Sequence, residues 1–189
     1  MKNIFLLFIS FLCFQFSFSQ TNVKKLDGPR FGITLFDKGL LADIINNDRD
    51  LNSDDPIDYI QSQAWTTQIG WQWETRLVEG DGIIGLVEWV AMIGGIEKGV
   101  FIPSASALMG IRKNNGFEIA VGPTLSFTGA GLIFAVGHTF KSGELNLPIN
   151  VAFVPSRTTH YLGKPDGEEL GSGHALTITV GFNFNRDKK

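Results

Sequence analysis

The 189-residue chain contains a single cysteine, Cys13, and only three histidines. One cysteine excludes a disulfide framework and any metal site built from several thiolates. Basic residues are not in excess either, because 16 lysines and arginines stand against 19 aspartates and glutamates. Without a basic surface, the chain is not expected to bind nucleic acid. Its length corresponds to one domain, with room for a short appendage.

The N-terminal residues have the pattern of a secretory signal peptide. Lys2 provides the positive charge, an apolar stretch over 4–18 follows, and two serines lie where a cleavage site before Gln20 needs small residues. The apolar stretch is short for a membrane anchor. We therefore expect residues 1–19 to be removed on export and residues 20–189 to form the mature domain.

Beyond that segment, no apolar run approaches the roughly 20 residues that a membrane-spanning helix needs. The mature chain alternates instead, with bulky apolar residues at most odd positions of 65–77 and polar residues or glycine at the even ones. This period of two is typical of a strand with two different faces, and it recurs over 117–127 and 176–184. Weaker patterns indicate five more strands, at about 29–36, 83–93, 100–112, 130–141 and 145–155. The sequence thus predicts eight strands, and one short helix over 38–46 that lies in a loop.

The connections between these strands are of two kinds. Three are tight polar turns, at 79–82, 113–116 and 141–144, and two are long, at about 37–62 and 156–173. In an up-and-down barrel, alternate connections lie at the same end, so the tight turns share one end and the long loops share the other. This asymmetry is typical of outer-membrane barrels, which have short periplasmic turns and longer outer loops.

The composition of the two strand faces separates a soluble barrel from a membrane barrel. One face carries small and uncharged polar residues, which suit the narrow interior of an eight-stranded barrel. The other face carries bulky apolar residues, whose aromatic members gather near both strand ends: Phe31, Trp73, Phe117, Phe140, Phe182 and Phe184 at the turn end, and Trp65, Phe101, Phe127 and Phe153 at the loop end. A soluble barrel or sandwich would bury that face. We expect it to contact lipid instead.

With these features the chain resembles the small eight-stranded outer-membrane β-barrel proteins of Gram-negative bacteria. The resemblance covers residues 20–189 and includes the final strand, 175–184, which is similar to the C-terminal signal that barrel-assembly machinery recognises, although residues 185–189 follow its last aromatic residue. It implies an all-β, eight-stranded, antiparallel, up-and-down transmembrane β-barrel. It further implies a monomer that lies in the cell outer membrane and contacts its lipid. The family is defined by architecture, so the resemblance implies no catalytic motif and no cofactor.

Six charged residues fall on the predicted inward face: Arg30, Glu74, Arg76, Glu88, Arg112 and Glu118. Three are basic and three are acidic, and all but one lie toward the turn end. In a lumen too narrow for free water, unpaired charges are costly, so we expect these residues to form ion pairs. A structural cluster that fills the lumen is the preferred interpretation, and a polar conduit or proton path is the alternative. An ion-selective pore is disfavoured because such pores use rings of charge of one sign.

Two further features are candidate sites of chemistry. His138 lies well inside a predicted strand on the apolar face, but no serine follows two residues later, as a lipid-modifying barrel enzyme would need. The acidic first loop contains 48–52, which is similar to the start of a calcium-binding loop. Its sixth position is Ser53 rather than glycine, and its twelfth is Tyr59 rather than glutamate. We therefore expect no metal site and no enzymatic activity.

The sequence favours a structural or surface-interaction role through the two long loops, 37–62 and 156–173. Two alternatives belong to other functional classes. One is a lipid-modifying outer-membrane enzyme, which requires a histidine and a serine side by side on the lipid-facing surface. The other is a soluble exported barrel that binds a ligand in an apolar central cavity.

Overall fold

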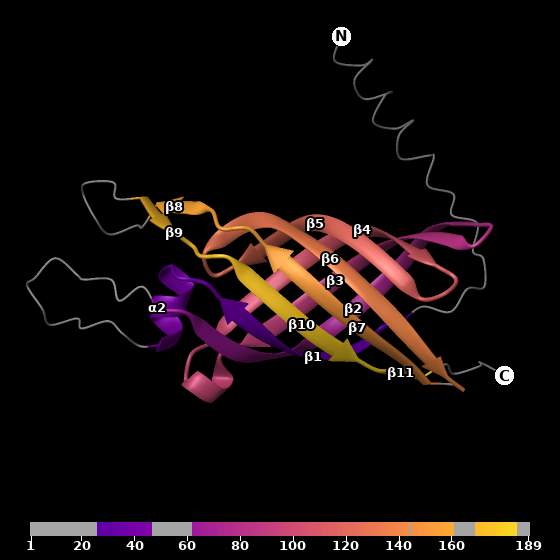
Figure 1. Ribbon diagram of the computed structural model, residues 1–189, viewed down its shortest axis with the longest axis horizontal. Helices are drawn as coiled ribbons and strands as arrows, with labels where there is room; N and C mark the ends of the chain where they lie inside the picture. Colours follow the sequence, from indigo (N-terminus) through magenta and orange to yellow (C-terminus); the bar gives the residue numbers. More distant parts are fainter. Residues whose placement is uncertain (1–25, 47–61, 144, 161–168, 185–189) are drawn as a thin grey trace, which may run out of the picture.

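The computed structural model describes residues 26–46, 62–143, 145–160 and 169–184 (Figure 1). Several expectations concern residues outside these ranges. They include the signal peptide at 1–19, the calcium-like segment that starts at 48–52, and the C-terminal extension at 185–189. Those expectations stay predictions.

The described residues form one closed antiparallel barrel. Its strands are β1 (Gly28–Phe36), β2 (Ala64–Gly80), β3 (Ile83–Gly94), β4 (Ile102–Lys113), β5 (Phe117–Ser126), β6 (Gly129–Ser142), β7 (Leu145–Val154), β10 (Ala175–Gly181) and β11 (Asn183–Phe184). Each strand pairs with the next, and β10 pairs with both β1 and β7, which closes the barrel. β11 continues along β7 where β10 ends, so the two together make the eighth strand. The predicted all-β, eight-stranded, up-and-down barrel is confirmed.

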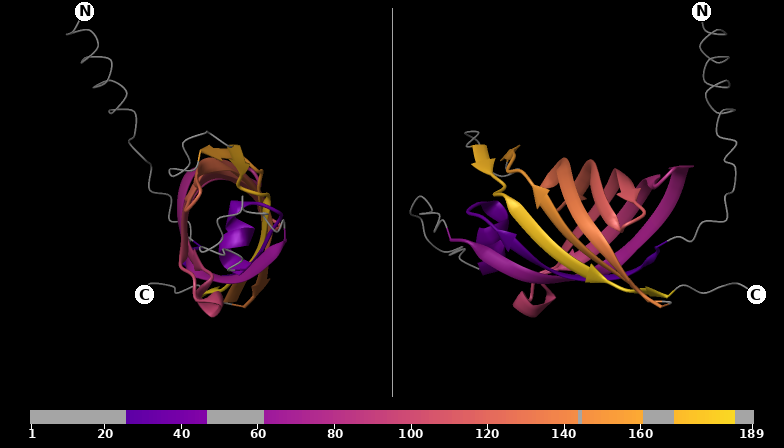
Figure 2. Two further views of the ribbon diagram at one scale, coloured as in Figure 1. Left: turned by 90° about the vertical axis from the view of Figure 1, so that its left-hand side faces the viewer. Right: turned by 45° about the vertical axis from the view of Figure 1, so that its right-hand side comes forward.

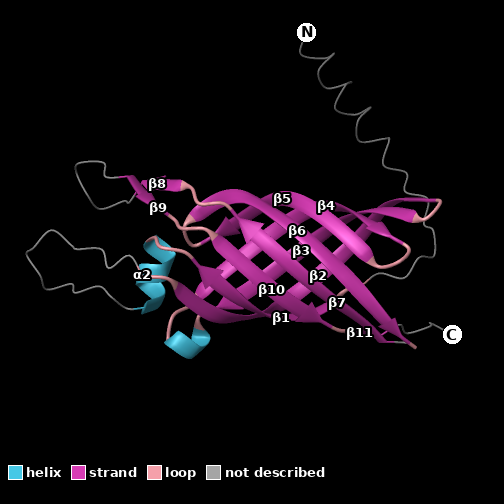
Figure 3. Ribbon diagram, in the orientation of Figure 1, coloured by secondary structure: helices cyan, strands magenta, loops and turns pink. Residues whose placement is uncertain are grey.

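The smaller elements all belong to the end that carries the long loops (Figure 3). They are the helix α2 (Leu40–Asn46), the 3-10 turn η1 (Ile96–Lys98), and the hairpin of β8 (Thr158–His160) with β9 (Glu169–Gly171). The expected short helix is present, shortened by two residues at its start. The β8–β9 hairpin was not predicted, because strands of three residues are too short to show an alternating pattern.

The tight turns lie at the opposite end, as the parity of the connections predicts (Figure 1). Gly82 and Gly116 have φ angles of 84° and 94°, a left-handed conformation that residues with a side chain rarely adopt. These glycines therefore let the chain reverse within a few residues between β2 and β3 and between β4 and β5. The short reversals fix the register of the two hairpins.

The barrel has polar residues inside and apolar residues outside. Along β2, the even-numbered Thr66, Gln72 and Glu74 are buried, while the odd-numbered Trp71 and Trp73 are exposed on the outer surface. The same alternation runs through β5 and β10. Because side chains point to opposite faces in turn, the sequence pattern translates directly into a polar lumen and an apolar exterior.

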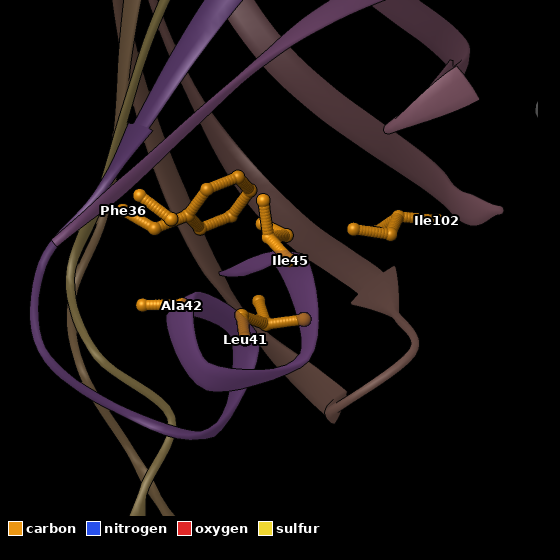
Figure 4. Close-up of a cluster of buried hydrophobic side chains, with 6 residues drawn as sticks. Phe36, Leu41, Ala42, Ile45 and Ile102 are labelled. Carbon is orange, nitrogen blue, oxygen red and sulfur yellow. The ribbon is translucent and has the colours of Figure 1, made fainter. Parts of the chain in front are cut away.

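The helix α2 lies in the first long loop, as expected, but most of its side chains are buried. It lies within the loop-end opening of the barrel (Figure 2, left). Leu41, Ala42 and Ile45 are buried and pack against residues at the loop ends of the strands, among them Phe36 and Ile102 (Figure 4). Burying a large aliphatic side chain stabilises a protein by about 1.5–3 kcal/mol. The helix thus contributes to an apolar cluster at the loop end of the interior.

The η1 turn is attached to β2 through Glu97. Its carboxylate accepts hydrogen bonds from the Thr67 amide and hydroxyl, both at 2.7 Å. Burial alone would raise the pKa of Glu97, but the hydrogen bonds from Thr67 outweigh it and lower the pKa from 4.5 to about 2. The ionised carboxylate is therefore the form that holds η1 against β2.

This arrangement predicts a pH dependence of stability. A carboxyl group with a lowered pKa contributes stability above its unfolded-state pKa, and that contribution is lost as the pH falls from there through about 2. The Glu97→Gln variant should therefore be less stable than wild type at pH 6, by about 1 kcal/mol or less because solvent screens an exposed group. Urea unfolding at a series of pH values is the measurement. A difference that persists undiminished at pH 2 would contradict the assignment.

Candidate functional site

A cluster of buried charges occupies the turn half of the lumen, with Arg112 of β4 at its centre. The Nε of Arg112 lies 2.5 Å from Oε2 of Glu118, and its NH2 lies 2.7 Å from Oε2 of Glu74. The same NH2 lies 3.5 Å from Oε1 of Glu88. All four side chains are almost fully buried. One guanidinium thus contacts three carboxylates from three different strands.

The register of the strands explains this convergence. Arg112 and Glu118 are direct partners across the β4–β5 hairpin, as expected from their positions on either side of its turn. Glu74 and Glu88 are direct partners across β2 and β3, a pairing of like charges that is destabilising by itself. Arg112 compensates this repulsion, and Arg76 adds a second cation, with its Nε 2.9 Å from Oε1 of Glu74. The structure therefore brings five of the six predicted residues into direct ion-pair contact.

Arg30 joins the cluster by a different route. Its Nε donates to Oε1 of Gln72 at 2.9 Å, and the Gln72 amide donates in turn to Glu88. The NH1 of Arg30 also donates to Oδ1 of Asn183 at 3.3 Å. A Cβ at Gly181 would lie 2.3 Å from NH1 of Arg30, so this glycine provides the space that the guanidinium occupies.

The two neutral amides were not among the predicted site residues. Gln72 and Asn183 both lie on the inward parity of their strands, which was the signal available in the sequence. Parity alone does not show that an amide, rather than a carboxylate, is the group in contact with Arg30. That depends on how far each side chain reaches once the barrel has closed.

The loop half of the lumen contains a cavity with a volume of about 120 Å³. Its floor includes Arg30, Gln72 and Glu88, and its other end reaches Leu41 of α2. The expectation of a lumen filled by side chains did not anticipate this space. The reason lies in the inward residues near the loop end, which are mainly serine, threonine, alanine and glycine in several strands.

The cavity wall is chemically mixed. Met92, Leu108 and Ile133 provide apolar surface, while Ser106 and Thr124 provide hydroxyl groups. These two hydroxyls already hydrogen-bond each other at 2.8 Å. At the loop end, Arg157 completes the lining. No pattern in the sequence indicates this arginine, because it lies beyond the end of β7 and belongs to no alternating stretch.

His138 lies on the outer side of β6, as its parity predicts. Its ring contacts that of Phe140, with centroids 4.6 Å apart. The residues directly opposite it on the neighbouring strands are Phe117 and Ile149. The register therefore places no hydroxyl nucleophile opposite this histidine.

In the described ranges, no helix has the length and apolar character needed to cross a membrane. The same residues contain no group of three or more histidine, cysteine, aspartate or glutamate side chains arranged to hold a metal ion. The search for similar proteins found no protein family, characterised protein or solved structure that matches the chain. Functional inference therefore depends on the geometry of the barrel.

Proposed function

We propose that this protein is an integral outer-membrane β-barrel of a Gram-negative bacterium, with a structural or surface-interaction role. The observation that carries the proposal is the reversed distribution of polarity. Ionisable side chains such as Glu74 and Arg30 are buried in the lumen, while large apolar side chains are exposed around the outer surface. Exposing that outer surface to water would be unfavourable, and soluble proteins rarely expose a continuous apolar area of this extent.

The position of the aromatic residues supports a bilayer as the surrounding medium. Those exposed near the turn end are Phe31, Trp73, Phe117, Phe140 and Phe182. Those exposed near the loop end are Trp65, Phe101, Phe127 and Phe153. Aromatic side chains prefer the two interfaces of a bilayer, where an apolar ring meets polar headgroups. Exposed aliphatic residues such as Val121 and Ile178 lie between these two groups, together with the exposed aromatic residues Trp71, Trp89 and Phe134.

The interior favours a closed barrel over a conducting pore. The charged cluster fills the turn half with equal numbers of opposite charges, and α2 lies in the loop-end opening. Pores that select ions use charges of one sign. A partner outside the membrane would meet the barrel at its loop end, where the β8–β9 hairpin and η1 lie.

Extraction from membranes tests the proposal. The protein produced with its signal peptide should sediment with the outer-membrane fraction and resist alkaline carbonate washing, because its apolar belt is solvated by lipid. In detergent it should give a β-type circular dichroism spectrum and migrate faster in gels before heating than after, since a closed barrel stays compact. Release into the soluble fraction without detergent would refute the membrane location while leaving the barrel fold intact.

A further inference from the structure

Arg157 is held at the loop end of the lumen by its main chain and by one end of its guanidinium. Its amide donates to Oγ of Ser172 at 3.0 Å, and its carbonyl accepts from the Ser172 amide at 2.9 Å. Its NH2 donates to Oγ of Ser126 at 2.8 Å and to Oγ1 of Thr128 at 3.0 Å. These contacts tie the segment after β7 to the connection between β5 and β6.

The rest of the guanidinium is buried without a partner. The Nε and NH1 atoms of Arg157 are shielded from solvent and have no hydrogen-bond acceptor among the residues that the structure describes. A Cβ at Gly131 would lie 1.9 Å from NH1, so the absence of a side chain there makes room for the guanidinium. Leaving such donors unpaired is costly, and the cost is higher for a charged group.

The charge of Arg157 is also uncompensated. The other arginines of the lumen, Arg30, Arg76 and Arg112, belong to a cluster with three glutamates. Burial lowers the pKa of Arg157, and no carboxylate among the described residues opposes that shift. An arginine stays protonated in proteins, so a full positive charge faces the cavity without a counter-ion from the described part of the chain.

The cavity next to this charge suits a short apolar chain. Its volume of about 120 Å³ is comparable with the roughly 150 Å³ that suffices to hold benzene in another protein. Met92, Leu108 and Ile133 line it, together with Glu88 toward the turn end and Arg157 toward the loop end. The acidic side chain at the floor disfavours a second anionic group on the ligand, and the volume limits the chain to about six carbon atoms.

We propose that the loop half of the lumen binds a small monocarboxylate with a short aliphatic chain. The carboxylate accepts hydrogen bonds from Nε or NH1 of Arg157, and the chain extends along the apolar wall toward the cluster. Charge-assisted hydrogen bonds of this type are stronger than neutral ones, which makes the ligand charge the main determinant of affinity. This site depends on the barrel fold and not on the membrane location, so it can be tested whether or not the proposed function holds.

The experiment compares hexanoate with hexan-1-ol as probes of the mature protein, in nonionic detergent. Calorimetric titration should show saturable binding of hexanoate, about 10-fold or more tighter than that of the alcohol. In a ¹⁵N spectrum, the Nε–H signal of Arg157 is identified as the one that is missing from the Arg157→Gln variant. Hexanoate should shift this signal in the wild-type protein. That variant should bind hexanoate about 10-fold or more weakly and the alcohol unchanged, because only the charged contact is lost.

Two further variants separate the site from general effects. Ala135→Leu fills the cavity while leaving Arg157 in place, and it should abolish hexanoate binding. Lys141→Gln removes a positive charge from the exposed turn end, and it should bind hexanoate like wild type. Equal affinity for hexanoate and hexan-1-ol, no saturable binding of hexanoate, or undiminished binding by Arg157→Gln would each overturn the proposal.

Discussion

Replacing Arg112 with methionine is expected to lower the free energy of unfolding by about 3–5 kcal/mol, the range for a buried ion pair that loses one partner. The Arg112 guanidinium contacts Glu74, Glu88 and Glu118 together. Methionine keeps much of the side-chain volume, so the loss would come from three buried carboxylates that have lost their common partner. Urea unfolding of the folded protein, followed by tryptophan fluorescence, measures the change.

Two comparisons make this result specific. Lys113→Met, at the next residue, removes an exposed positive charge and should change stability by no more than about 0.5 kcal/mol. Glu118→Gln should lie between the two, because Arg112 keeps its contacts with Glu74 and Glu88. If Arg112→Met were as stable as Lys113→Met, the cluster would not hold the lumen together, and its alternative role as a polar conduit would gain support.

The barrel was predictable because each strand carries its own signal in the sequence. In β2 the expected range of 65–77 became 64–80, and its buried and exposed residues follow the odd–even pattern almost throughout. The turns at Gly82 and Gly116 need only local chemistry to be recognised. Every strand buries one face, and successive connections alternate between the two ends of the barrel. These two constraints leave few alternative topologies. Local patterns therefore determined a global architecture.

The contents of the lumen were only partly predictable, because they depend on which side chains meet after closure. The alternation along each strand identified the charged residues that point inward. Of these, Arg112 and Glu118 flank the β4–β5 turn and could be paired from the register of that hairpin alone. The hydrogen bond from Arg30 to Gln72 and the packing of the Arg157 guanidinium against Gly131 both join residues that are distant in sequence. The position of α2 was missed for the same reason. The helix has only seven residues, and its apolar face is recognisable as a cover for the barrel only once Phe36 and Ile102 are in place.

The division of the lumen links the two proposals. The turn half is occupied by balanced charges, whereas the loop half combines a cavity with the unpaired donors of Arg157. In an outer-membrane orientation with the long loops outward, the cavity lies on the external side of the cluster. A ligand held there would be separated from the periplasm by the ion pairs.

Val121→Arg is expected to destabilise the protein by about 2–4 kcal/mol when the barrel is folded into a phospholipid bilayer. Val121 is in the middle of β5, opposite Met109 and Phe134, and its side chain is 44% exposed on the outer surface. A charge placed there would have to lie in the hydrocarbon region, where solvation is poorest. Reversible unfolding from lipid vesicles gives the free-energy difference.

Ile96→Arg provides the control, because it places the same charge on an exposed residue near the loop end and not in the middle of a strand. Ile96 belongs to η1 at the loop end and is 63% exposed, which is more than Val121. If the outer surface faced water throughout, both arginines would be tolerated to within about 0.5 kcal/mol. If the barrel spans a bilayer, Val121→Arg is the more costly of the two, since η1 follows the loop end of β3 and a charge near the bilayer interface costs only about 0–1 kcal/mol. Equal tolerance of the two substitutions would mean that the apolar belt does not contact lipid, and the proposed location in the outer membrane would be wrong.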